Sequence, residues 1–565
     1  MNVFVASADA TSATFQYTLA NGDSLLVQQG VTLVHSAQGT IIRASTGGHV
    51  DVQGTLFGNI RFGGISGIGT GNSVAIGATG AIFGGNDAAV TTTSDASAVH
   101  NQGQLSGRVG ILMGSEIPGN QNAQVSNDGF ILGTEAGIIS FSGNGAQVNN
   151  AGTIRVGRAA FSSFQADPLG DLVGGIMLLG DNAAIVNTGD VLVGAANAYG
   201  IAVAGQGTMI ENAGLIQTSN ATSQRGAVTL FAPVAGITTF TNLTQGSVVS
   251  GVTAVLGGDG NDRIINLGLL SGDVVLAGGT DRVANAGVIR GDVLLGAGSD
   301  TYDGRGGVVL QSLVNAGEAA DTYVLSDART TVIDSGTMGR DTLFVSADYA
   351  LAAASGIDLI RLTGLARTFV GDDGVNEVIG TGLANLLSGM GGVDTLRGQG
   401  GDDDLRGGAD GDSLFGGDDQ DTIWGDAGND RVLGDTGDDL LRGGAGLDTL
   451  TGGLGADTLS GGSGADVFDF NDLAETEVSD ADRIADFLRG TDRIDLSGVD
   501  ARPGVAGDQV FAFVGAAAFT GVGQLRVVIV GGDVVVQVNT VAGVAAEAAL
   551  VVAGVGTLGG GDFIL

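Results

Sequence analysis

The sequence contains no cysteine and no lysine, and only four prolines and one tryptophan among its 565 residues. Without cysteine the chain forms no disulfide and no thiolate metal site, and thiol catalysis is excluded. All 23 basic residues are arginine, and they face 61 acidic residues, which gives a net charge of −38. This charge argues against nucleic acid as a partner and favours cations. Bound metal is then the natural source of stability outside a cell.

Long apolar runs are also missing. No stretch approaches the roughly 18 apolar residues of a membrane span, so we expect no transmembrane segment. The first residues, Met1 to Ser7, lack the basic and apolar segments of a secretory signal peptide. If the protein leaves the cell, we expect its export signal to lie elsewhere.

Glycine, in contrast, is abundant, with 104 residues. Hydrophobic residues make up 43% of the chain and charged residues 15%, a composition typical of a folded protein with a real core. Much glycine with little proline favours many tight turns between short strands.

Ten nonapeptides follow one another without a gap from residue 380 to residue 469. The sixth position of the first unit is Asn385, and in the other nine units it is Asp394, Asp403, Asp412, Asp421, Asp430, Asp439, Asp448, Asp457 and Asp466. An apolar residue follows two positions later, namely Leu396, Leu405, Leu414, Ile423, Val432, Leu441, Leu450, Leu459 and Phe468, with Leu386 taken as its counterpart in the first unit. A flexible Gly/Asp linker has no reason to keep these residues in phase. The pattern is that of the GGxGxDxUx nonapeptide, which forms a calcium-binding parallel β-helix.

The spacing predicts the geometry of this repeat block. We expect six residues of each unit to form a tight turn and the last three a short strand with its apolar side chain inward. Two units make one coil, and five coils stacked at about 4.8 Å span about 24 Å. One inward side chain per strand gives a thin core that needs further stabilisation.

Calcium is the expected source of that stabilisation. Aspartates 18 residues apart, such as Asp394 with Asp412 or Asp448 with Asp466, should come together beside turn carbonyls. Calcium takes six to eight oxygen ligands in irregular geometry, whereas magnesium demands an octahedron. The expected calcium-site residues are the nine aspartates together with the turn glycines Gly389, Gly391, Gly398, Gly400, Gly407, Gly416, Gly425, Gly434, Gly443, Gly452 and Gly461.

The charge of the block makes its folding depend on calcium. Residues 389–469 contain 18 aspartates and 4 arginines, a net charge of −14 that opposes compaction without cations. Extracellular calcium modules often have dissociation constants of about 0.1–1 mM, so such sites would be empty in the cytosol and filled outside.

A looser repeat occupies the N-terminal part of the chain. An Asn-x-Gly motif followed by a short strand recurs at intervals of 19 to 37 residues in most cases, beginning at Asn101, Asn127, Asn150, Asn187, Asn212, Asn266, Asn285 and Asn315. Asparagine and glycine tolerate left-handed turns, and stacked asparagines form side-chain ladders. We interpret this part as a parallel β-helix with about one coil per repeat. A β-sandwich of short strands is the alternative.

A transition zone lies between the two repeats. Residues 257–265 form a complete nonapeptide, and weaker copies place Asp281, Asp300, Asp321 and Asp341 at intervals of 19 to 21 residues. The sequence leaves open whether Asp262 and Asp300 bind calcium or belong to ordinary polar turns.

Residues 380–469 resemble the RTX, or haemolysin-type, calcium-binding repeats. The segments 482–487 and 492–497, which read DRIADF and DRIDLS, and the segments 518–521 and 523–526 resemble the C-terminal domain of serralysin-type secreted metalloproteases. The ending DFIL at 562–565 is similar to the C-terminal signal of type I secretion. Together the resemblance covers about residues 371–565. It implies export through the type I machinery of a Gram-negative bacterium to the cell surface or the medium.

The resemblance has one departure. The family commonly has an acidic, glycine-containing loop late in this domain, whereas residues 538–545 here are free of acid. A further metal site in this loop is therefore not expected.

We expect an all-β chain with four parts. A parallel β-helix with Asn-x-Gly repeats (1–250) continues through degenerate coils (251–370) into a calcium-binding parallel β-roll (371–469). A β-rich secretion domain (470–565) follows.

Enzyme motifs are missing. The three histidines, His35, His49 and His100, do not form the His-Glu-x-x-His motif of a zinc protease, and no Gly-x-Ser-x-Gly elbow occurs. We therefore expect a non-enzymatic surface or matrix protein or adhesin that binds a cell-surface glycan or assembles with itself. The alternative is a lyase-like or epimerase-like carbohydrate-active enzyme on the β-helix. Carboxylates clustered with an Arg or Tyr would favour the enzyme, and a face of Asn, Ser and Thr would favour the structural role.

Overall fold

The computed structural model of the chain describes residues 3–12, 17–20, 23–35, 40–44, 48–62, 72–84, 88–92, 97–113, 122–140, 144–157, 174–195, 198–219, 225–231, 236–310, 313–336, 338–476, 478–503, 505–506, 509–541 and 545–565. These residues form two compact units, 1–321 and 322–565. Regular structure within them is β-strand, apart from two short 3-10 helices, η1 (Leu473–Thr476) and η2 (Gly560–Asp562).

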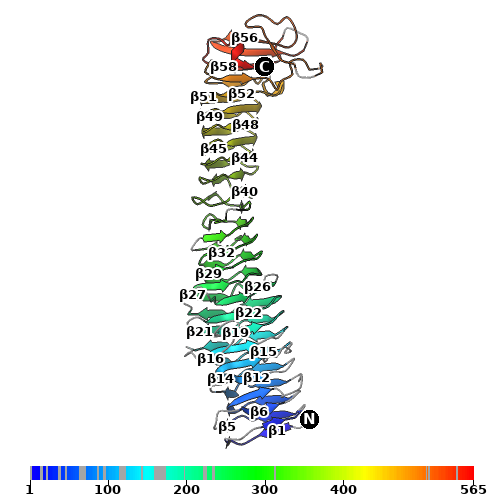
Figure 1. The fold of residues 1–565 in the computed structure, drawn as a ribbon, viewed down its shortest axis with the longest axis vertical. Coiled ribbons are helices and arrows are strands. Elements are labelled where there is room, and N and C mark those ends of the chain that lie inside the picture. The colour runs from blue at the N-terminus through cyan, green and yellow to red at the C-terminus, as the bar shows by residue number, and fades with distance from the viewer. Residues whose placement is uncertain are drawn as a thin grey trace. The chain divides into compact units, whose positions relative to one another are not determined.

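The first unit is a parallel β-helix whose coils stack from blue to green in Figure 1. On its first face each strand pairs in parallel with the corresponding strand of the next coil. These strands are β1 (Val3–Ala6), β4 (Ser24–Val27), β7 (His49–Val52), β10 (Ser73–Ile76), β13 (Ala98–Asn101), β15 (Gln124–Asn127), β17 (Gln147–Asn150), β20 (Ala184–Asn187), β23 (Thr208–Asn212), β26 (Ile237–Asn242), β28 (Asn261–Asn266), β30 (Arg282–Asn285) and β33 (Thr301–Asp303).

Two further columns of parallel strands complete each coil. One consists of β2 (Ala10–Ser12), β5 (Thr32–His35), β8 (Thr55–Phe57), β11 (Ala81–Phe83), β14 (Gln104–Met113), β16 (Phe130–Ser140), β18 (Thr153–Val156), β21 (Asp190–Val193), β24 (Leu215–Thr218), β27 (Ser247–Leu256), β29 (Leu269–Val275), β31 (Val288–Arg290) and β34 (Val308–Val309). The other contains β3 (Tyr17–Leu19), β6 (Thr40–Ala44), β9 (Asn59–Phe62), β12 (Ala88–Thr92), β19 (Gly174–Leu179), β22 (Tyr199–Ala204), β25 (Val228–Phe231), β32 (Val293–Gly296) and β35 (Leu313–Ala316). The long strands β14, β16, β27 and β29 pair with both columns, and register shifts interrupt β14–β16 and β27–β29 pairing.

The core of the first unit follows from strand alternation. Along the first face every second residue points inward, and the inward residues of successive coils are in register, as in Val50, Val74 and Val99. Period-two alternation combined with parallel stacking therefore buries one aliphatic column along each face. The parallel pairing confirms the expected all-β fold with a parallel β-helix, and the β-sandwich alternative is wrong.

An asparagine ladder runs along the ends of the first-face strands. Each asparagine Nδ2 donates to the Oδ1 of the next coil's asparagine at 2.7–2.9 Å, through Asn101, Asn127, Asn150, Asn187, Asn212, Asn242, Asn266 and Asn285. All of these side chains are buried. The Asn-x-Gly motif predicted every member except Asn242, because the glycine of that turn stands at 246 instead of 244. The side-chain geometry of Asn315 lies outside the described residues.

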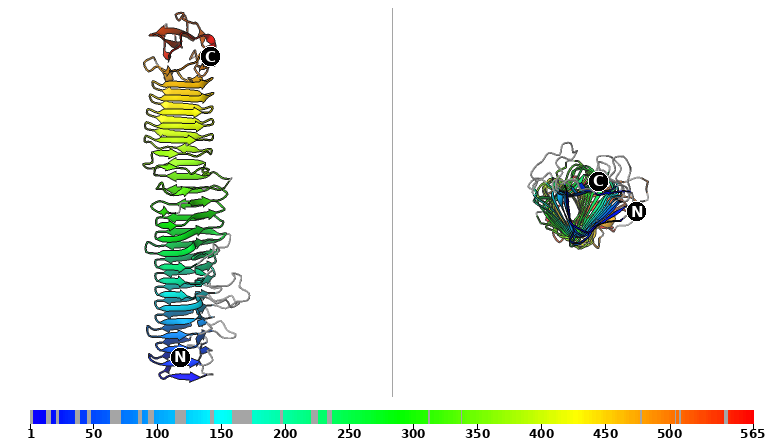
Figure 2. Two further views of the ribbon diagram at one scale, coloured as in Figure 1. Left: turned by 90° about the vertical axis from the view of Figure 1, so that its left-hand side faces the viewer. Right: turned by 90° about the horizontal axis from the view of Figure 1, so that it is seen from below.

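The second unit contains the repeat block (yellow-green to orange in the left view of Figure 2). Its first sheet consists of the parallel strands β36 (Thr322–Leu325), β38 (Thr342–Val345), β40 (Leu359–Leu362), β42 (Glu377–Ile379), β44 (Thr395–Gly400), β46 (Ser413–Asp418), β48 (Arg431–Thr436), β50 (Thr449–Leu454), β52 (Val467–Asp469), β54 (Arg493–Asp495) and β59 (Phe563–Ile564). The parallel part of its second sheet consists of β39 (Tyr349–Ala350), β41 (Thr368–Val370), β43 (Leu386–Met390), β45 (Asp404–Ala409), β47 (Thr422–Ala427), β49 (Leu440–Gly446), β51 (Thr458–Gly464), β53 (Arg483–Ile484) and β58 (Ala548–Val552). A further two-residue strand is β37 (Thr331–Val332).

Alternate nonapeptides thus contribute to opposite sheets of a β-roll. Their inward residues, from Leu396 to Phe468, are fully buried. In the first nonapeptide of the block the inward residue is Leu387, which is 0% exposed, whereas Leu386 is 44% exposed. The expectation that Leu386 points inward was therefore wrong. Most strands are also longer than the three residues expected, because the backbone of the following turn stays in register with the next coil, as at Gln399 and Gly417.

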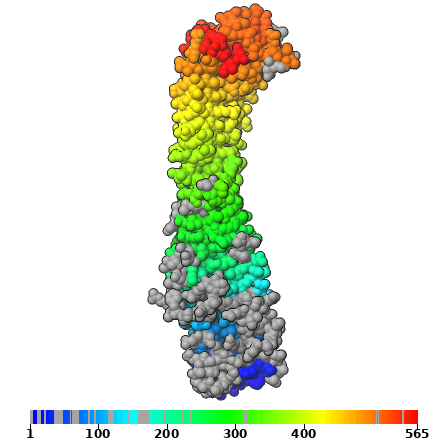
Figure 3. All heavy atoms as spheres, viewed as in Figure 1, coloured from blue at the N-terminus to red at the C-terminus, as the bar shows by residue number. Residues whose placement is uncertain are grey.

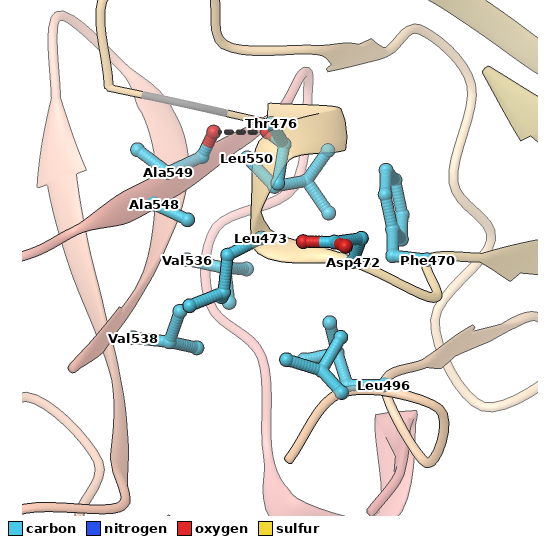
Figure 4. A pocket seen from close by; sticks show the side chains of 11 residues that line it. Phe470, Asp472, Leu473, Thr476, Leu496, Val536, Val538, Ala548, Ala549 and Leu550 are labelled. Atoms are coloured by element: carbon cyan, nitrogen blue, oxygen red, sulfur yellow. Dashed lines mark hydrogen bonds between the residues drawn. The ribbon is translucent and has the colours of Figure 1, made fainter. Parts of the chain in front are cut away.

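The roll ends in an antiparallel meander. Strand β58 pairs with β57 (Asp533–Asn539), which pairs with β56 (Gln524–Val530), and β55 (Ala512–Phe513) joins its edge. Helix η1 packs against this meander, and the Oγ1 of Thr476 donates to the carbonyl of Ala549. A small apolar pocket remains between them, lined by residues such as Leu473, Leu496 and Val536 (Figure 4).

Candidate calcium site

The sixth-position aspartates form two continuous columns, one for each set of alternate turns. The backbone N–H of each aspartate from Asp394 to Asp448 donates to the Oδ1 of the aspartate 18 residues later, at 2.8–3.1 Å. The expected pairs Asp394–Asp412 and Asp448–Asp466 are among them. Each carboxylate therefore bridges two coils and is fixed by the backbone of the preceding turn.

The second oxygen of each carboxylate has no such partner. The Oδ2 atoms of all nine aspartates, from Asp394 to Asp466, are buried and accept no hydrogen bond. An unpaired buried carboxylate oxygen costs several kcal/mol unless a cation or proton compensates it. A column of hard oxygen atoms with nothing to neutralise it is chemically suited to calcium.

The first glycine of each nonapeptide makes room for this oxygen. A Cβ atom on Gly389, Gly398, Gly407, Gly416, Gly425, Gly434, Gly443, Gly452 or Gly461 would lie 2.0–2.4 Å from the Oδ2 of the aspartate of the same unit. At Gly398 the carbonyl oxygen of Gly416, in the next coil, is also only 2.6 Å away. The missing side chain thus leaves a space bordered by a carboxylate and a carbonyl oxygen.

Turn positions two and four favour glycine for a different reason, which is the conformation of the backbone. They adopt positive φ in the nine nonapeptides from residue 389 onward, as at Gly408 (122°) and Gly446 (150°). Six non-glycine residues share this conformation, namely Met390, Gln399, Asp410, Asp419, Asp426 and Asp435. Such residues carry a backbone penalty that glycine avoids.

Gly391 and Gly400, at position three, show neither constraint. Their φ values are not positive, and the nearest atoms to an added Cβ lie at 3.6 Å and 3.7 Å. The structure therefore gives no steric reason for glycine at these two expected site positions, while their carbonyl groups remain part of the turn.

Burial changes the acidity of the aspartates. It raises the pKa of Asp394, Asp403, Asp412, Asp421 and Asp439 to about 7, against the lowering effect of the backbone N–H donors. The pKa values of Asp448 and Asp457 rise to about 6, and those of Asp430 and Asp466 also rise. Without a cation, these carboxylates are poorly stabilised in their charged form.

Two members of the columns were missed by the sequence interpretation. Asp482 and Asp492 accept the backbone N–H groups of Asp457 (2.9 Å) and Asp466 (3.2 Å), so they close the two columns. Burial raises the pKa of Asp482 to about 8. Both residues begin an Asp-Arg-Ile sequence that repeats the Asp-x-apolar signature, but 25 or 26 residues after the preceding member instead of 18. The irregular spacing hid them.

The fold and these columns define a calcium-binding parallel β-roll. Residues 370–405 and 379–414 match the family model of the RTX calcium-binding nonapeptide repeat. Residues 413–550 match that of the peptidase M10 serralysin C-terminal domain. Residues 370–414 thus contain RTX calcium-binding repeats, which make calcium the cofactor of this part of the chain, and residues 413–550 contain a serralysin-like C-terminal domain.

The solution structure of the R3 subunit of a mannuronan C5-epimerase from Azotobacter vinelandii is 25% identical, with a TM-score of 0.16. That match covers 28% of this chain and 78% of the other. A TM-score this low does not define a shared overall fold. No curated protein was found to match the chain.

The residues with a described position include no helix long and apolar enough to cross a bilayer.

Proposed function

We propose that this chain is a non-enzymatic protein of the bacterial cell surface or extracellular matrix, exported by type I secretion, whose repeat block folds when it binds calcium outside the cell. The buried, unpartnered Oδ2 column carries the calcium part of this proposal. In it, Asp394, Asp403, Asp412, Asp421, Asp430, Asp439, Asp448, Asp457 and Asp466 supply carboxylate oxygens, and the turn glycines supply carbonyls and space. Asp482 and Asp492 complete the last coils.

Export is supported by the serralysin-like domain that follows the repeats. Calcium is scarce in the cytosol, where sites with dissociation constants of about 0.1–1 mM stay empty and the acidic block remains open. An open chain suits passage through an export machine, and calcium outside then drives compaction. Deletion of residues 470–565 should retain the protein in the cell, and export of the truncated chain would contradict this part of the proposal.

The first unit supports a structural role more than a catalytic one. Among the described residues of this unit, three arginines lie beside a carboxylate or a tyrosine, and one of them, Arg305, pairs with Asp303 at 2.6 Å. Arg108 and Glu135 are ion-paired at 3.0 Å, and the guanidinium of Arg225 stacks on the buried ring of Tyr199 at 5.0 Å. The described contacts of these three arginines include one carboxylate or one tyrosine each, whereas a lyase or epimerase would require carboxylates beside a basic group. Cleavage or epimerisation of an acidic polysaccharide by the calcium-loaded protein would favour the enzyme alternative.

The calcium proposal is testable in the full chain because its single tryptophan, Trp424, lies within the block. The guanidinium of Arg406 stacks on the indole at 4.7 Å, and Arg442 is in register with Trp424 on the next strand of the sheet. Compaction should therefore change Trp424 fluorescence and anisotropy. We expect a cooperative change at about 0.1–1 mM calcium. Magnesium at the same concentrations serves as the control. A signal that is insensitive to calcium, or equal with magnesium, would refute calcium-dependent folding of the block.

A further inference from the structure

The first unit contains a second aspartate column, outside the segments that match the repeat family. The backbone N–H of Asp262 donates to Asp281 Oδ1 at 2.7 Å, and that of Asp281 donates to Asp300 Oδ1 at 2.7 Å. This is the bridging pattern of the repeat block, with a spacing of 19 residues instead of 18. The family matches begin only at residue 370.

Three buried oxygen atoms in successive coils of this column lack a hydrogen-bond partner. They are Thr238 Oγ1, Asp262 Oδ1 and Asp281 Oδ2. Thr238 is in register with Asp262 on the neighbouring strand. The exposed fractions of Thr238, Asp262 and Asp281 are 0%, 2% and 1%, so water does not solvate these groups from outside.

The turn at Gly257 leaves space beside this column. A Cβ on Gly257 would lie 2.4 Å from Asp262 Oδ2, as at the first glycine of each repeat. The backbone N–H of Gly258 donates to the same oxygen at 3.1 Å, which leaves Asp262 Oδ1 as the orphaned atom.

The surrounding charges do not compensate the carboxylates. The charged groups that act on Asp281 are Asp262 and Asp300, both of the same sign. Arg263 and Arg282 follow the aspartates in sequence but are exposed, on the outward side of the strands. Burial raises the pKa of Asp262 to about 7 and that of Asp281 to about 8, which reflects the same lack of compensation.

We propose that Asp262 and Asp281 bind a calcium-like divalent cation within the first unit, with Thr238 as an additional oxygen donor. A hard divalent ion between these coils would satisfy the orphaned carboxylate oxygens of Asp262 and Asp281 and cancel the repulsion along the column, and Thr238 Oγ1 is the further oxygen in register with Asp262. Calcium then also binds the β-helix, at residues that precede the nonapeptide block in the chain. The competing arrangement is a metal-free column in which a carboxyl group keeps its proton.

Hydrogen–deuterium exchange of the full chain, with and without calcium, separates these two arrangements. If calcium binds this column, peptides covering residues 257–282 become protected by calcium. At free calcium tenfold above the dissociation constant, exchange through local opening slows about elevenfold. Peptides from 389–469 report independently on the repeat block, so failure of this site and failure of the proposed calcium function are distinguishable.

The double variant Asp262→Asn, Asp281→Asn supplies the decisive comparison. Asparagine keeps one oxygen acceptor but offers no second carboxylate oxygen, so the calcium effect on 257–282 should disappear while that on 389–469 remains. Without calcium, the same peptides should exchange more slowly than in the parent protein, because the buried charge is gone. Asp259→Asn, an exposed acid in the same turn, is the matched control and should leave the response unchanged. Equal exchange of 257–282 with and without calcium in the parent protein, or an unaltered response in the double variant, would overturn the proposal.

Discussion

The contrast between Gly398 and Gly400 tests the calcium column most directly. Both are glycines of one nonapeptide, both are expected site residues, and they stand two positions apart. A Cβ on Gly398 would lie 2.0 Å from Asp403 Oδ2 and 2.6 Å from the Gly416 carbonyl oxygen, whereas a Cβ on Gly400 meets nothing nearer than 3.7 Å. Alanine at 398 must displace the oxygen atoms that border the cation space, and alanine at 400 need displace nothing.

The two substitutions are expected to change the free energy of unfolding differently. Overpacking at Gly398→Ala costs about 1–3 kcal/mol. Loss of one calcium ion adds about 2.7 kcal/mol at a free concentration one hundredfold above the dissociation constant. The sum is about 4–6 kcal/mol. Gly400→Ala, at an ordinary φ, should be neutral or stabilising by about 0.4–1 kcal/mol through the unfolded state.

Trp424 fluorescence measures both variants in the full chain. Gly398→Ala should shift the calcium midpoint upward and lower the denaturant midpoint at saturating calcium, and Gly400→Ala should leave the calcium midpoint unchanged. If the two alanines shift the calcium midpoint equally, or if Gly398→Ala leaves it unchanged, the Oδ2 column does not face the cation.

Three further predictions concern acidity, backbone conformation and the asparagine ladder. Burial raises the folded-state pKa values of Asp403, Asp412, Asp421 and Asp439 from 3.8 to about 7, so the metal-depleted roll should be most stable below pH 4 and lose that stability as the pH rises through about 7. Calcium affinity should rise over the same pH range. A Trp424 signal that does not change with pH in the metal-depleted protein would contradict this prediction. Asp426→Gly, at φ 71°, should stabilise the calcium-loaded block by about 1 kcal/mol in denaturant unfolding; Asp418→Gly, which removes the same charge without relieving a positive φ, should not, and equal effects would assign the gain to charge. Asn242→Ala removes two hydrogen bonds of the ladder, one in which Asn242 is the donor and one in which it is the acceptor, so it should destabilise the first unit by about 2–4 kcal/mol. Thermal unfolding, with Thr241→Ala as the control, measures this change. A destabilisation below about 1 kcal/mol would show that the ladder is dispensable.

The parts of the fold with a strict period were predictable from sequence. The nine in-phase aspartates and their apolar followers predicted the β-roll, because only a stacked coil brings residues 18 apart into register. The Asn-x-Gly motif predicted the β-helix, because asparagine and glycine together specify a turn. The division of the chain at residues 250, 370 and 469 stays a prediction, although the boundary between the two compact units, at 321, falls inside the expected transition zone.

The parts that depend on coil length or on side-chain geometry were not predictable. The Asn-x-Gly motif did not predict Asn242 as a ladder member because its turn is two residues longer. The nonapeptide period did not predict Asp482 and Asp492 as column members because insertions precede them. The separate roles of the turn glycines were also hidden, since the sequence GGxG does not reveal which glycine faces a carboxylate and which has a positive φ. Contacts between coils decide these features, and such contacts have no fixed spacing in the chain.

The asparagine ladder and the aspartate columns differ in one chemical property, which explains why only the aspartates need a bound metal ion. An asparagine side chain carries both a donor and an acceptor, so each member of the first ladder satisfies the next, and the column closes without an ion. An ionised aspartate carries acceptors only. One of its oxygens accepts a backbone N–H, and the other is left for a cation. Strand β28 contains both, with Asp262 near its start and Asn266 at its end. In this strand and in the next coil, where Asp281 and Asn285 recur, the self-sufficient ladder runs beside the aspartate column that we propose binds an ion. Stability of the coils before β26 should therefore be independent of calcium, and dependence on calcium should begin at the coils that contain Thr238 and Asp262 and not at the first nonapeptide of the family repeat.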